Sequence, residues 1–121
     1  MSRKLLLVVD DEENIRLLYK EELTEEGYDV ILAENGYEAI DLVKENDVDL
    51  VVLDIKMPKI DGIETLRLLK EEKRDMPVVL CSAYGEYKQD FSTWASDAYI
   101  VKTADLSELK SIINNIMKEE E

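Results

Sequence analysis

Five polar side chains follow the apolar runs of this sequence, at the points where buried strands would end. Asp10 and Asp11 follow the run "LLLVV", and Asp54, Ser82 and Lys102 each come at the end of a later run. In open α/β sheets, ligands bind outside the carboxyl ends of the strands. If these runs form neighbouring parallel strands, three carboxylates, one hydroxyl and one ammonium group gather at one edge of one sheet.

The chemistry of that set is specific. Carboxylate oxygens suit Mg²⁺, which typically takes one or two carboxylates together with phosphate oxygens and water. A carboxylate on the metal beside a lysine and a hydroxyl can attack a phosphoryl group, because the ion neutralises the developing charge and Lys102 holds an equatorial oxygen. We therefore predict a site that accepts a phosphoryl group onto an aspartate.

Each of these residues also has a purely structural interpretation. Asp10 or Asp11 could cap the following helix, and Asp54 could be a turn residue ahead of Pro58. Ser82 could bond to backbone, and Lys102 could be a solvated strand end. The occurrence of all five at the expected strand ends favours the site over five independent structural roles.

Two other kinds of phosphate site fit less well. A phosphatase of the haloacid dehalogenase type needs a second aspartate two residues after its nucleophile, where this chain has Lys56. A flavin mononucleotide site needs a hydroxyl-rich or glycine-rich loop after the first strand. The segment "DDEE" found there would repel phosphate in the absence of a metal.

The elements that position these residues follow from the hydrophobic pattern. Continuous apolar runs, typical of parallel strands covered on both faces, predict strands at 4–9, 29–33, 49–54, 77–82 and 98–102. Helical spacing predicts helices at 13–26, 36–46 and 62–73, a weak helix within 84–97, and a last helix carrying Leu109 to Met117. In the first helix, Ile15, Leu18, Tyr19 and Leu23 share one stripe. Five repeats of strand and helix predict a doubly wound α/β fold, and the 121 residues predict a single domain over 1–121.

Composition excludes several classes of function. The chain has 29 acidic against 15 basic side chains and a net charge of −14, which opposes direct binding to nucleic acid or anionic lipid. It has no histidine, so imidazole catalysis is excluded. Cys81 is the single cysteine and reads as a small core residue. The first apolar run is too short for a signal peptide or a membrane span, so we expect a soluble, cytoplasmic protein.

Two groups of apolar residues have uncertain roles on pattern alone. The stretch from 84 to 99 concentrates aromatic residues, which indicates either core packing or a surface that faces a partner. These residues are Tyr84, Tyr87, Phe91, Trp94 and Tyr99. In the first helix, Leu17 falls off the apolar stripe and Ile15 lies at its exposed start, so each is either a scattered surface residue or a contact residue.

The sequence resembles the receiver domain of two-component response regulators over essentially its whole length. The segments "LVVDDEENIR", "VVLDIKMPKIDGIE", "CSAYGE" and "AYIVK" occur in the family's order and near its spacing. The resemblance implies a flavodoxin-like (βα)5 sandwich, with a parallel five-stranded sheet of order 2-1-3-4-5 and helices on both faces. It also implies that Asp54 receives a phosphoryl group from a histidine of a sensor kinase or histidine phosphotransfer protein, with Mg²⁺ as cofactor and Mn²⁺ as the alternative ion.

The resemblance assigns roles to individual residues. Asp11, Asp54 and the carbonyl of Lys56 would coordinate the metal directly, and Asp10 would act mostly through water. The Ser82 hydroxyl, the Ala83 amide and Lys102 would bind the phosphoryl oxygens. Ser82 and Tyr99 would form the switch, and the positions of Lys56 and Tyr84 would tune the lifetime of the phosphoryl group. Because both side chains are bulky here, we hypothesise that they shield the phosphoryl group from water and lengthen its lifetime. The family usually has proline after the lysine, with a cis peptide. Thr103 stands there in this chain, so we expect a trans bond, because a cis bond costs ~2.5 to 4 kcal/mol before a non-proline residue.

The resemblance also implies the partners. Ile15 and Leu17 would contact the kinase, while Tyr87, Phe91 and Trp94 would face a downstream protein target. We expect a signalling switch, monomeric or dimerising on phosphorylation, and not an enzyme acting on a separate metabolite. Three alternatives stay open: the receiver module of a longer DNA-binding or enzymatic regulator, an interaction module without phosphate turnover, and a Mg²⁺-dependent phosphatase.

Overall fold

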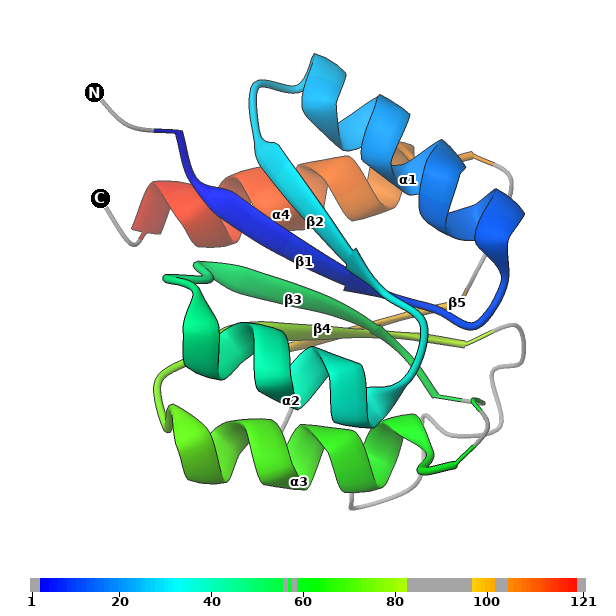
Figure 1. Cartoon of the computed structure of the whole chain (residues 1–121). Coiled ribbons are helices and arrows are strands. Elements are labelled where there is room, and N and C mark those ends of the chain that lie inside the picture. The colour runs from blue at the N-terminus through cyan, green and yellow to red at the C-terminus, as the bar shows by residue number, and fades with distance from the viewer. Residues whose placement is uncertain (1–2, 56, 58, 83–96, 102–104, 120–121) are drawn as a thin grey trace.

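Five parallel strands form one sheet at the centre of the molecule (Figure 1). The computed structural model describes residues 3–55, 57, 59–82, 97–101 and 105–119. The strand order is β2-β1-β3-β4-β5, as predicted. The bounds are β1 Leu5–Val9, β2 Asp29–Ala33, β3 Leu50–Asp54, β4 Val78–Ser82 and β5 Ala98–Val101. Each strand lies within one residue of its predicted range.

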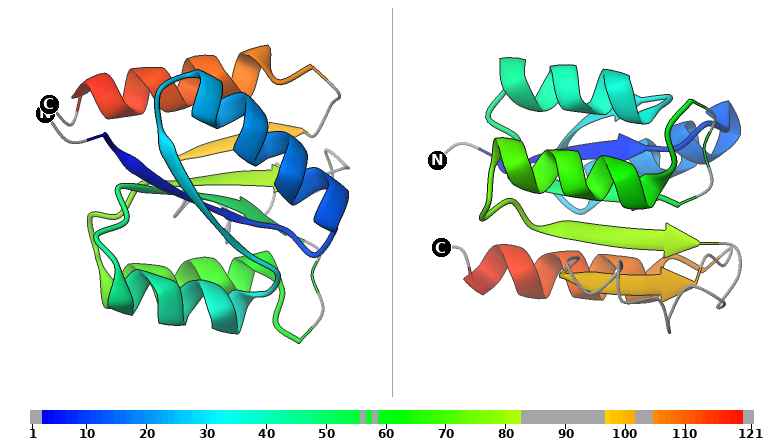
Figure 2. Two further views of the ribbon diagram at one scale, coloured as in Figure 1. Left: turned by 45° about the horizontal axis from the view of Figure 1, so that its top comes forward. Right: turned by 90° about the horizontal axis from the view of Figure 1, so that it is seen from below.

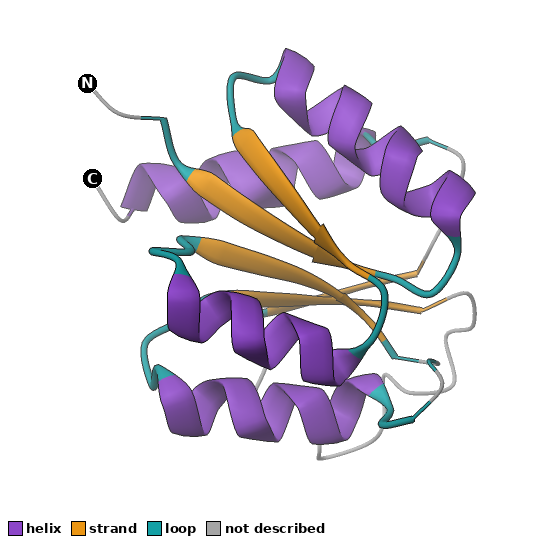
Figure 3. Cartoon of the chain, viewed as in Figure 1, coloured by secondary structure: helices purple, strands orange, loops and turns teal. Residues whose placement is uncertain are grey.

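Four helices in the described residues cover the two faces of the sheet (Figures 1 and 3). They are α1 Glu13–Glu25, α2 Gly36–Glu45, α3 Gly62–Glu72 and α4 Ser107–Glu119. Figure 2 shows α1 and α4 on one face and α2 and α3 on the other. The weak helix predicted within 84–97 falls outside the described residues except for Asp97, and so do Tyr84, Tyr87, Phe91 and Trp94.

Two apolar cores result from the alternation of side chains along the strands. Leu6 and Val8 of β1 point to the side of α1 and α4, whereas Leu7 and Val9 point to the side of α2 and α3. Both sets are almost completely buried. Because each strand contributes to both cores, its interior is a continuous apolar run and polar residues occur only at strand ends, as expected for a parallel sheet covered on both faces.

The apolar stripe of α1 is narrower than predicted. Tyr19 and Leu23 are buried, and Ile15 is half-buried and packs against the same core. Leu18, however, is 40% exposed, so its assignment to the stripe is wrong. Adjacent residues of a helix point about 100° apart, so Leu18 and Tyr19 cannot both face the core. The tyrosine is the one that is buried. The exposed side of α1 therefore carries Leu18 next to Leu17, which is 53% exposed.

Pairs of hydrogen bonds join neighbouring strands at the edge where the strands begin. The Asp49 N–H donates to the Leu5 carbonyl over 2.8 Å, and the Asp49 carboxylate accepts from the Leu5 N–H over 2.7 Å. Asp97 and Val78 exchange the same two bonds, both 2.8 Å. Asp49 directly precedes β3, and Asp97 directly precedes β5. We refer to these as the two aspartate clamps, between β1 and β3 and between β4 and β5.

The helices are anchored by side chains at their ends. Asn35 caps α2 by accepting from the Glu38 N–H, and Asp61 caps α3 by accepting from the Glu64 N–H. Ahead of α4, Asp105 accepts from both the hydroxyl and the N–H of Ser107, and these hydrogen bonds lower the pKa of the Asp105 carboxyl.

Candidate functional site

Three carboxylates meet where β1 and β3 end. Oxygens of Asp10, Asp11 and Asp54 all lie within 4.8 Å of one another. The pairing of Val9 with Leu53 explains this arrangement, because the next residues along the two strands are Asp10 and Asp54. Asp10 is 2% exposed and Asp54 6% exposed, while Asp11 is open to solvent. We call these three residues the aspartate triad.

The triad is electrostatically unfavourable without a cation. At this separation and an effective dielectric of about 20, each pair of ionised carboxylates repels by on the order of 3 kcal/mol. The three residues of the triad offer carboxylate oxygens, which are the hard ligands that Mg²⁺ prefers. The residues present therefore fit a divalent metal ion.

Asp10 is held by its backbone as well as by its side chain. Its N–H donates to the Ala33 carbonyl of β2 over 3.1 Å, and its carboxylate accepts from the Glu12 N–H over 3.0 Å. Its carbonyl accepts from the Arg16 guanidinium over 2.8 Å. Glu12 is the N-cap residue of α1 and makes no side-chain cap bond. The Asp10 carboxylate thus contacts the N-cap residue of α1 from two residues upstream.

Asp54 is placed by the chain that follows it. The Ile55 N–H donates to the Cys81 carbonyl over 3.1 Å, which continues the pairing of β3 with β4. The Gly62 N–H then donates to the Ile55 carbonyl over 2.6 Å, so the start of α3 folds back onto the end of β3. A Cβ atom on Gly62 would lie 2.6 Å from the Ile55 Cα and closer still to the Asp54 carbonyl oxygen. Only glycine fits this close approach.

Ser82 and Tyr99 lie on the two strands beyond Asp54. Cys81 pairs with Asp54, so Ser82 is one residue farther along β4, and it is almost fully buried. Tyr99 pairs with Leu80, is half-buried and packs against the core under α2 and α3. Of the residues predicted to bind or shield the metal and the phosphoryl group, four fall outside the described residues. They are Lys56, Ala83, Tyr84 and Lys102, together with the peptide from Lys102 to Thr103.

The residues proposed for kinase contact differ in exposure. Leu17 is exposed on α1, as expected for a contact residue, but Ile15 packs partly into the core beneath α1 and α4. Leu18 joins Leu17 on the exposed side. Leu18 and Arg16 are the residues near the site that the sequence pattern did not identify. The sequence feature that could have identified Arg16 is its position: it is a basic residue three positions after a run of four consecutive carboxylates.

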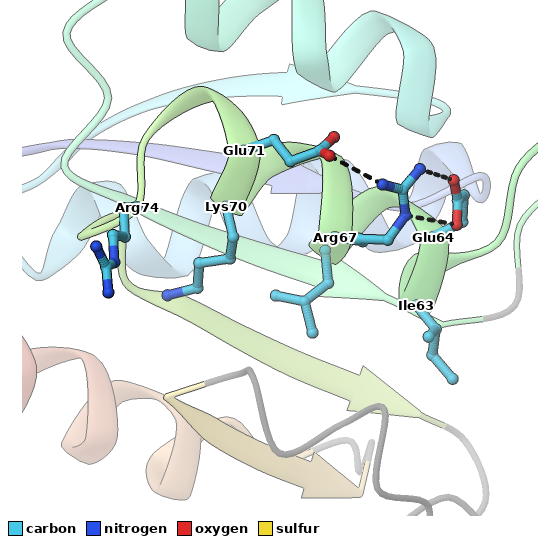
Figure 4. A pocket seen from close by; sticks show the side chains of 7 residues that line it. Ile63, Glu64, Arg67, Lys70, Glu71 and Arg74 are labelled. Carbon is cyan, nitrogen blue, oxygen red and sulfur yellow. Dashed lines mark hydrogen bonds and ion pairs between the residues drawn. The ribbon is translucent and has the colours of Figure 1, made fainter.

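A pocket of about 620 Å³ lies away from the triad, along α3 (Figure 4). There Arg67 bridges Glu64 and Glu71, with its shortest bond, 2.6 Å, to Glu64. This hydrogen bonding lowers the pKa of Glu64 and raises that of Arg67. Lys70 pairs instead with Asp97, 3.1 Å away and outside the lining. No triad residue is among the described lining residues. They are Ile63, Glu64, Leu66, Arg67, Lys70, Glu71 and Arg74.

Within the described residues, no helix is long and apolar enough to cross a membrane.

Comparison with known proteins identifies relatives along almost the whole chain. The family model described as "Response regulator receiver domain" matches residues 6–114. Sporulation initiation phosphotransferase F of Bacillus subtilis is 34% identical over 119 residues, which cover 97% of this chain and 96% of that protein. The probable transcriptional regulator ycf27 of Porphyra purpurea is 36% identical, and the chain spans about half of its length, 49%.

Solved structures give the same result. The response regulator TrrA of Thermotoga maritima, crystallised with Mg²⁺–BeF, is 47% identical with a TM-score of 0.90, over 93% of this chain and 97% of that one. TrrA in complex with the histidine kinase ThkA superposes with a TM-score of 0.88 over the same shares of the two chains. These findings confirm the resemblance drawn from the sequence motifs. The chain belongs to the response regulator receiver domain family.

Proposed function

We propose that this chain is a phosphoacceptor switch of a two-component system. It takes a phosphoryl group from a histidine of a kinase or phosphotransfer protein onto Asp54, in a Mg²⁺-dependent reaction, and then changes the partners that it binds. The observation that carries this proposal is the aspartate triad at the ends of β1 and β3. The solved complexes of TrrA, one with Mg²⁺–BeF and one with a histidine kinase, support it.

The chemical step uses Asp54 as the nucleophile. A carboxylate oxygen of Asp54 attacks phosphorus, the bond from phosphorus to the donor's histidine nitrogen breaks, and its electron pair leaves on that nitrogen. When bound, Mg²⁺ neutralises the charge that develops on the phosphoryl oxygens. Asp11 and Asp54 would hold the metal directly and Asp10 mostly through water. The Ser82 hydroxyl and Lys102 would bind the phosphoryl oxygens, joined by the Ala83 amide.

In the same proposal, the conformational change that follows phosphorylation takes place on the neighbouring strands β4 and β5. Ser82 moves toward the new phosphoryl group, and Tyr99 on β5 turns further inward. Lys56 supplies a carbonyl ligand, and the side chains of Lys56 and Tyr84 shield the phosphoryl group from water. Tyr99 is half-buried against the core under α2 and α3, so an inward turn would bury the part of its surface that is still exposed.

The direct test is incubation of the chain with an acyl phosphate, with and without Mg²⁺. We expect the intact mass to rise by one phosphoryl group only when Mg²⁺ is present, and peptide mapping to place that group on the peptide containing Asp54. Modification at another residue, or modification that persists in excess chelator, would contradict the proposal. Steady turnover of an aryl phosphate under the same conditions would instead identify a phosphatase.

Mg²⁺ is expected to raise the melting temperature of the chain, because the ion relieves the repulsion within the triad. If the dissociation constant is on the order of 1 mM, about 10 mM Mg²⁺ adds roughly 1.4 kcal/mol to the free energy of unfolding. That corresponds to roughly 3–6 °C for a domain of this size. An Asp11→Ala variant should lose this increment and should melt higher than the wild-type chain in the absence of metal.

Differential scanning calorimetry with Mg²⁺, with Ca²⁺ and without a divalent ion measures the increment, and a further arm tests Mn²⁺ as the alternative ion. Asp47→Ala is the matched control, because Asp47 is an exposed aspartate that is not part of the triad. If Asp11→Ala keeps the full increment while Asp47→Ala also keeps it, Asp11 is not a ligand.

The kinase is proposed to dock on the exposed side of α1. Leu17 and Leu18 are adjacent leucines, 53% and 40% exposed, one to two turns into the helix that follows Asp10 and Asp11. Exposed apolar side chains beside an active site favour a protein contact. Ile15 contributes less than predicted from the sequence, because part of its surface already packs into the core.

A Leu17→Asn, Leu18→Asn double variant is expected to lower kcat/KM for phosphotransfer from a histidine kinase by about tenfold or more, the effect of losing 1.4 kcal/mol of contact energy. The kinase used is one that phosphorylates the wild-type chain. Phosphorylation by an acyl phosphate should stay unchanged. Tyr37→Ser on α2 is the control, since Tyr37 is equally exposed at 54% but lies on a helix of the opposite face. Equal loss with both donors would place the effect in the site and not in docking.

A further inference from the structure

Arg16 lies with its guanidinium against the backbone of the triad. One of its terminal nitrogens, Nη1, donates to the Asp10 carbonyl over 2.8 Å, and its side chain is only 15% exposed. Its other terminal nitrogen, Nη2, lies 4.0 Å from a carboxylate oxygen of Glu34 in the loop after β2. The residue belongs to the first turn of α1 and reaches back over the junction between β1 and the helix.

The bond to the Asp10 carbonyl determines how Asp11 is presented. The Asp10 carbonyl and the Asp11 nitrogen belong to the same planar peptide unit, so fixing the carbonyl fixes the plane from which the Asp11 side chain leaves. The neighbouring groups are already fixed, since the Asp10 N–H is bonded to Ala33 and its carboxylate to the Glu12 N–H. Asp11 itself is exposed, so little packing holds its side chain.

The ion pair with Glu34 is the weaker of the two contacts of Arg16. Its separation is 4.0 Å and the Glu34 side chain is 63% exposed, a geometry for which ion pairs contribute little. The bond to the carbonyl is short, comes from a charged donor and is mostly shielded from water, conditions under which hydrogen bonds are strong. The main effect of Arg16 therefore acts on the backbone of Asp10.

We infer that Arg16 is a positioning residue of the metal site: it orients the peptide between Asp10 and Asp11 so that both carboxylates face the ion. This inference rests on the proposed function, in which the triad binds Mg²⁺. Residues that orient metal ligands through hydrogen bonds typically change metal affinity 10- to 100-fold when they are replaced.

The sign of the effect separates positioning from simple charge. A guanidinium near the site repels a divalent cation, so removal of its charge alone would tighten Mg²⁺ binding. Loss of the hydrogen bond to Asp10 would weaken Mg²⁺ binding. The Asp10 and Asp11 carboxylates would then be less ordered in the free protein, and ordering them on binding would reduce the binding free energy. An Arg16→Met variant loses both the charge and the bond, and we expect the loss of positioning to dominate.

The experiment compares Arg16→Met with two control variants by calorimetric titration of Mg²⁺. Glu34→Gln removes the ion pair of Arg16 but leaves its bond to Asp10. Lys110→Met removes a 2.8 Å ion pair between α4 and Glu22, which tethers α1 at a place remote from the triad. The hydrogen exchange rate of the Glu12 amide, measured in Mg²⁺-free protein, reports the order of the Asp10 turn independently of any metal.

We expect Arg16→Met to bind Mg²⁺ about tenfold more weakly and to exchange the Glu12 amide faster than the wild-type chain. Both controls should stay within about twofold in Mg²⁺ affinity, even if Lys110→Met melts lower. If Arg16→Met does not fold, Arg16→Gln takes its place with the same expectation. Unchanged or tighter Mg²⁺ binding in a folded variant would overturn the inference alone, whereas a wild-type chain that binds no Mg²⁺ would overturn the proposed function as well.

Discussion

An Asp54→Asn variant is expected to take up no phosphoryl group from an acyl phosphate and yet to be more stable than the wild-type chain when Mg²⁺ is absent. The amide has no carboxylate oxygen to attack phosphorus, so the reaction stops. The same substitution removes one of three carboxylates that lie within 4.8 Å of one another. Since each pair repels by on the order of 3 kcal/mol before relaxation and screening, we expect a net gain of about 1–2 kcal/mol in the free energy of unfolding.

Denaturant unfolding in chelator measures the stability, and intact mass after incubation with donor and Mg²⁺ measures the uptake. Asp47→Asn is the control, because it makes the same chemical change at an exposed aspartate that is not part of the triad. It should be phosphorylated normally and keep the wild-type stability. Full phosphorylation of Asp54→Asn would show that another residue is the acceptor, and a loss of stability would show that the triad carries no net repulsion.

A Gly62→Ala variant is expected to lose about 3 kcal/mol or more of stability and most of its Mg²⁺ response. The added Cβ would meet the backbone of Asp54 and Ile55, at 2.6 Å from the Ile55 Cα. Backbone atoms cannot rotate away as a side chain can, so either the start of α3 or the end of β3 has to move. Overpacking in a well-packed region typically costs 1–3 kcal/mol, occasionally more, and we expect the upper end here.

Gly27 provides a matched control for this prediction. It has φ = 101°, and a Cβ built on it meets nothing within 4 Å. Gly27→Ala should cost about 1–2 kcal/mol through backbone strain alone and should keep the full increase in melting temperature with Mg²⁺. If Gly62→Ala also keeps that increase, the contact between α3 and β3 serves the fold without placing Asp54.

Strand-end residues were the part of the site that could be predicted from the sequence. A parallel strand buried on both faces is a continuous apolar run, so the residue that ends the run is visible, as with Asp10, Asp54 and Ser82. The strand order and the motifs then placed these residues at one edge. The alternation of side chains along β1 follows from the same geometry.

The remaining features depend on contacts that no local pattern encodes. The bond from Arg16 to the Asp10 carbonyl requires a long side chain to turn back toward the preceding strand, and helical spacing describes only the direction in which a side chain leaves the helix. The misassigned Leu18 has the same cause, because two adjacent apolar residues, Leu18 and Tyr19, compete for one buried position. The close approach of Gly62 to Asp54 became visible only with the backbone in place.

The aspartate clamps fix the register of the paired strands at the edge where the strands begin. From Leu5 to Asp10 and from Asp49 to Asp54 the two chains advance by the same number of residues, five in each case. Inserting one residue into β1 or β3 alone would displace one carboxylate by about 3.3 Å relative to the other and turn it to the opposite face of the sheet. The second clamp fixes β4 and β5 in the same way. The two strands advance by the same number of residues, from Val78 opposite Asp97 at one end to Ser82 opposite Val101 at the other. In evolution or in design, strands of this sheet can therefore change length only in pairs.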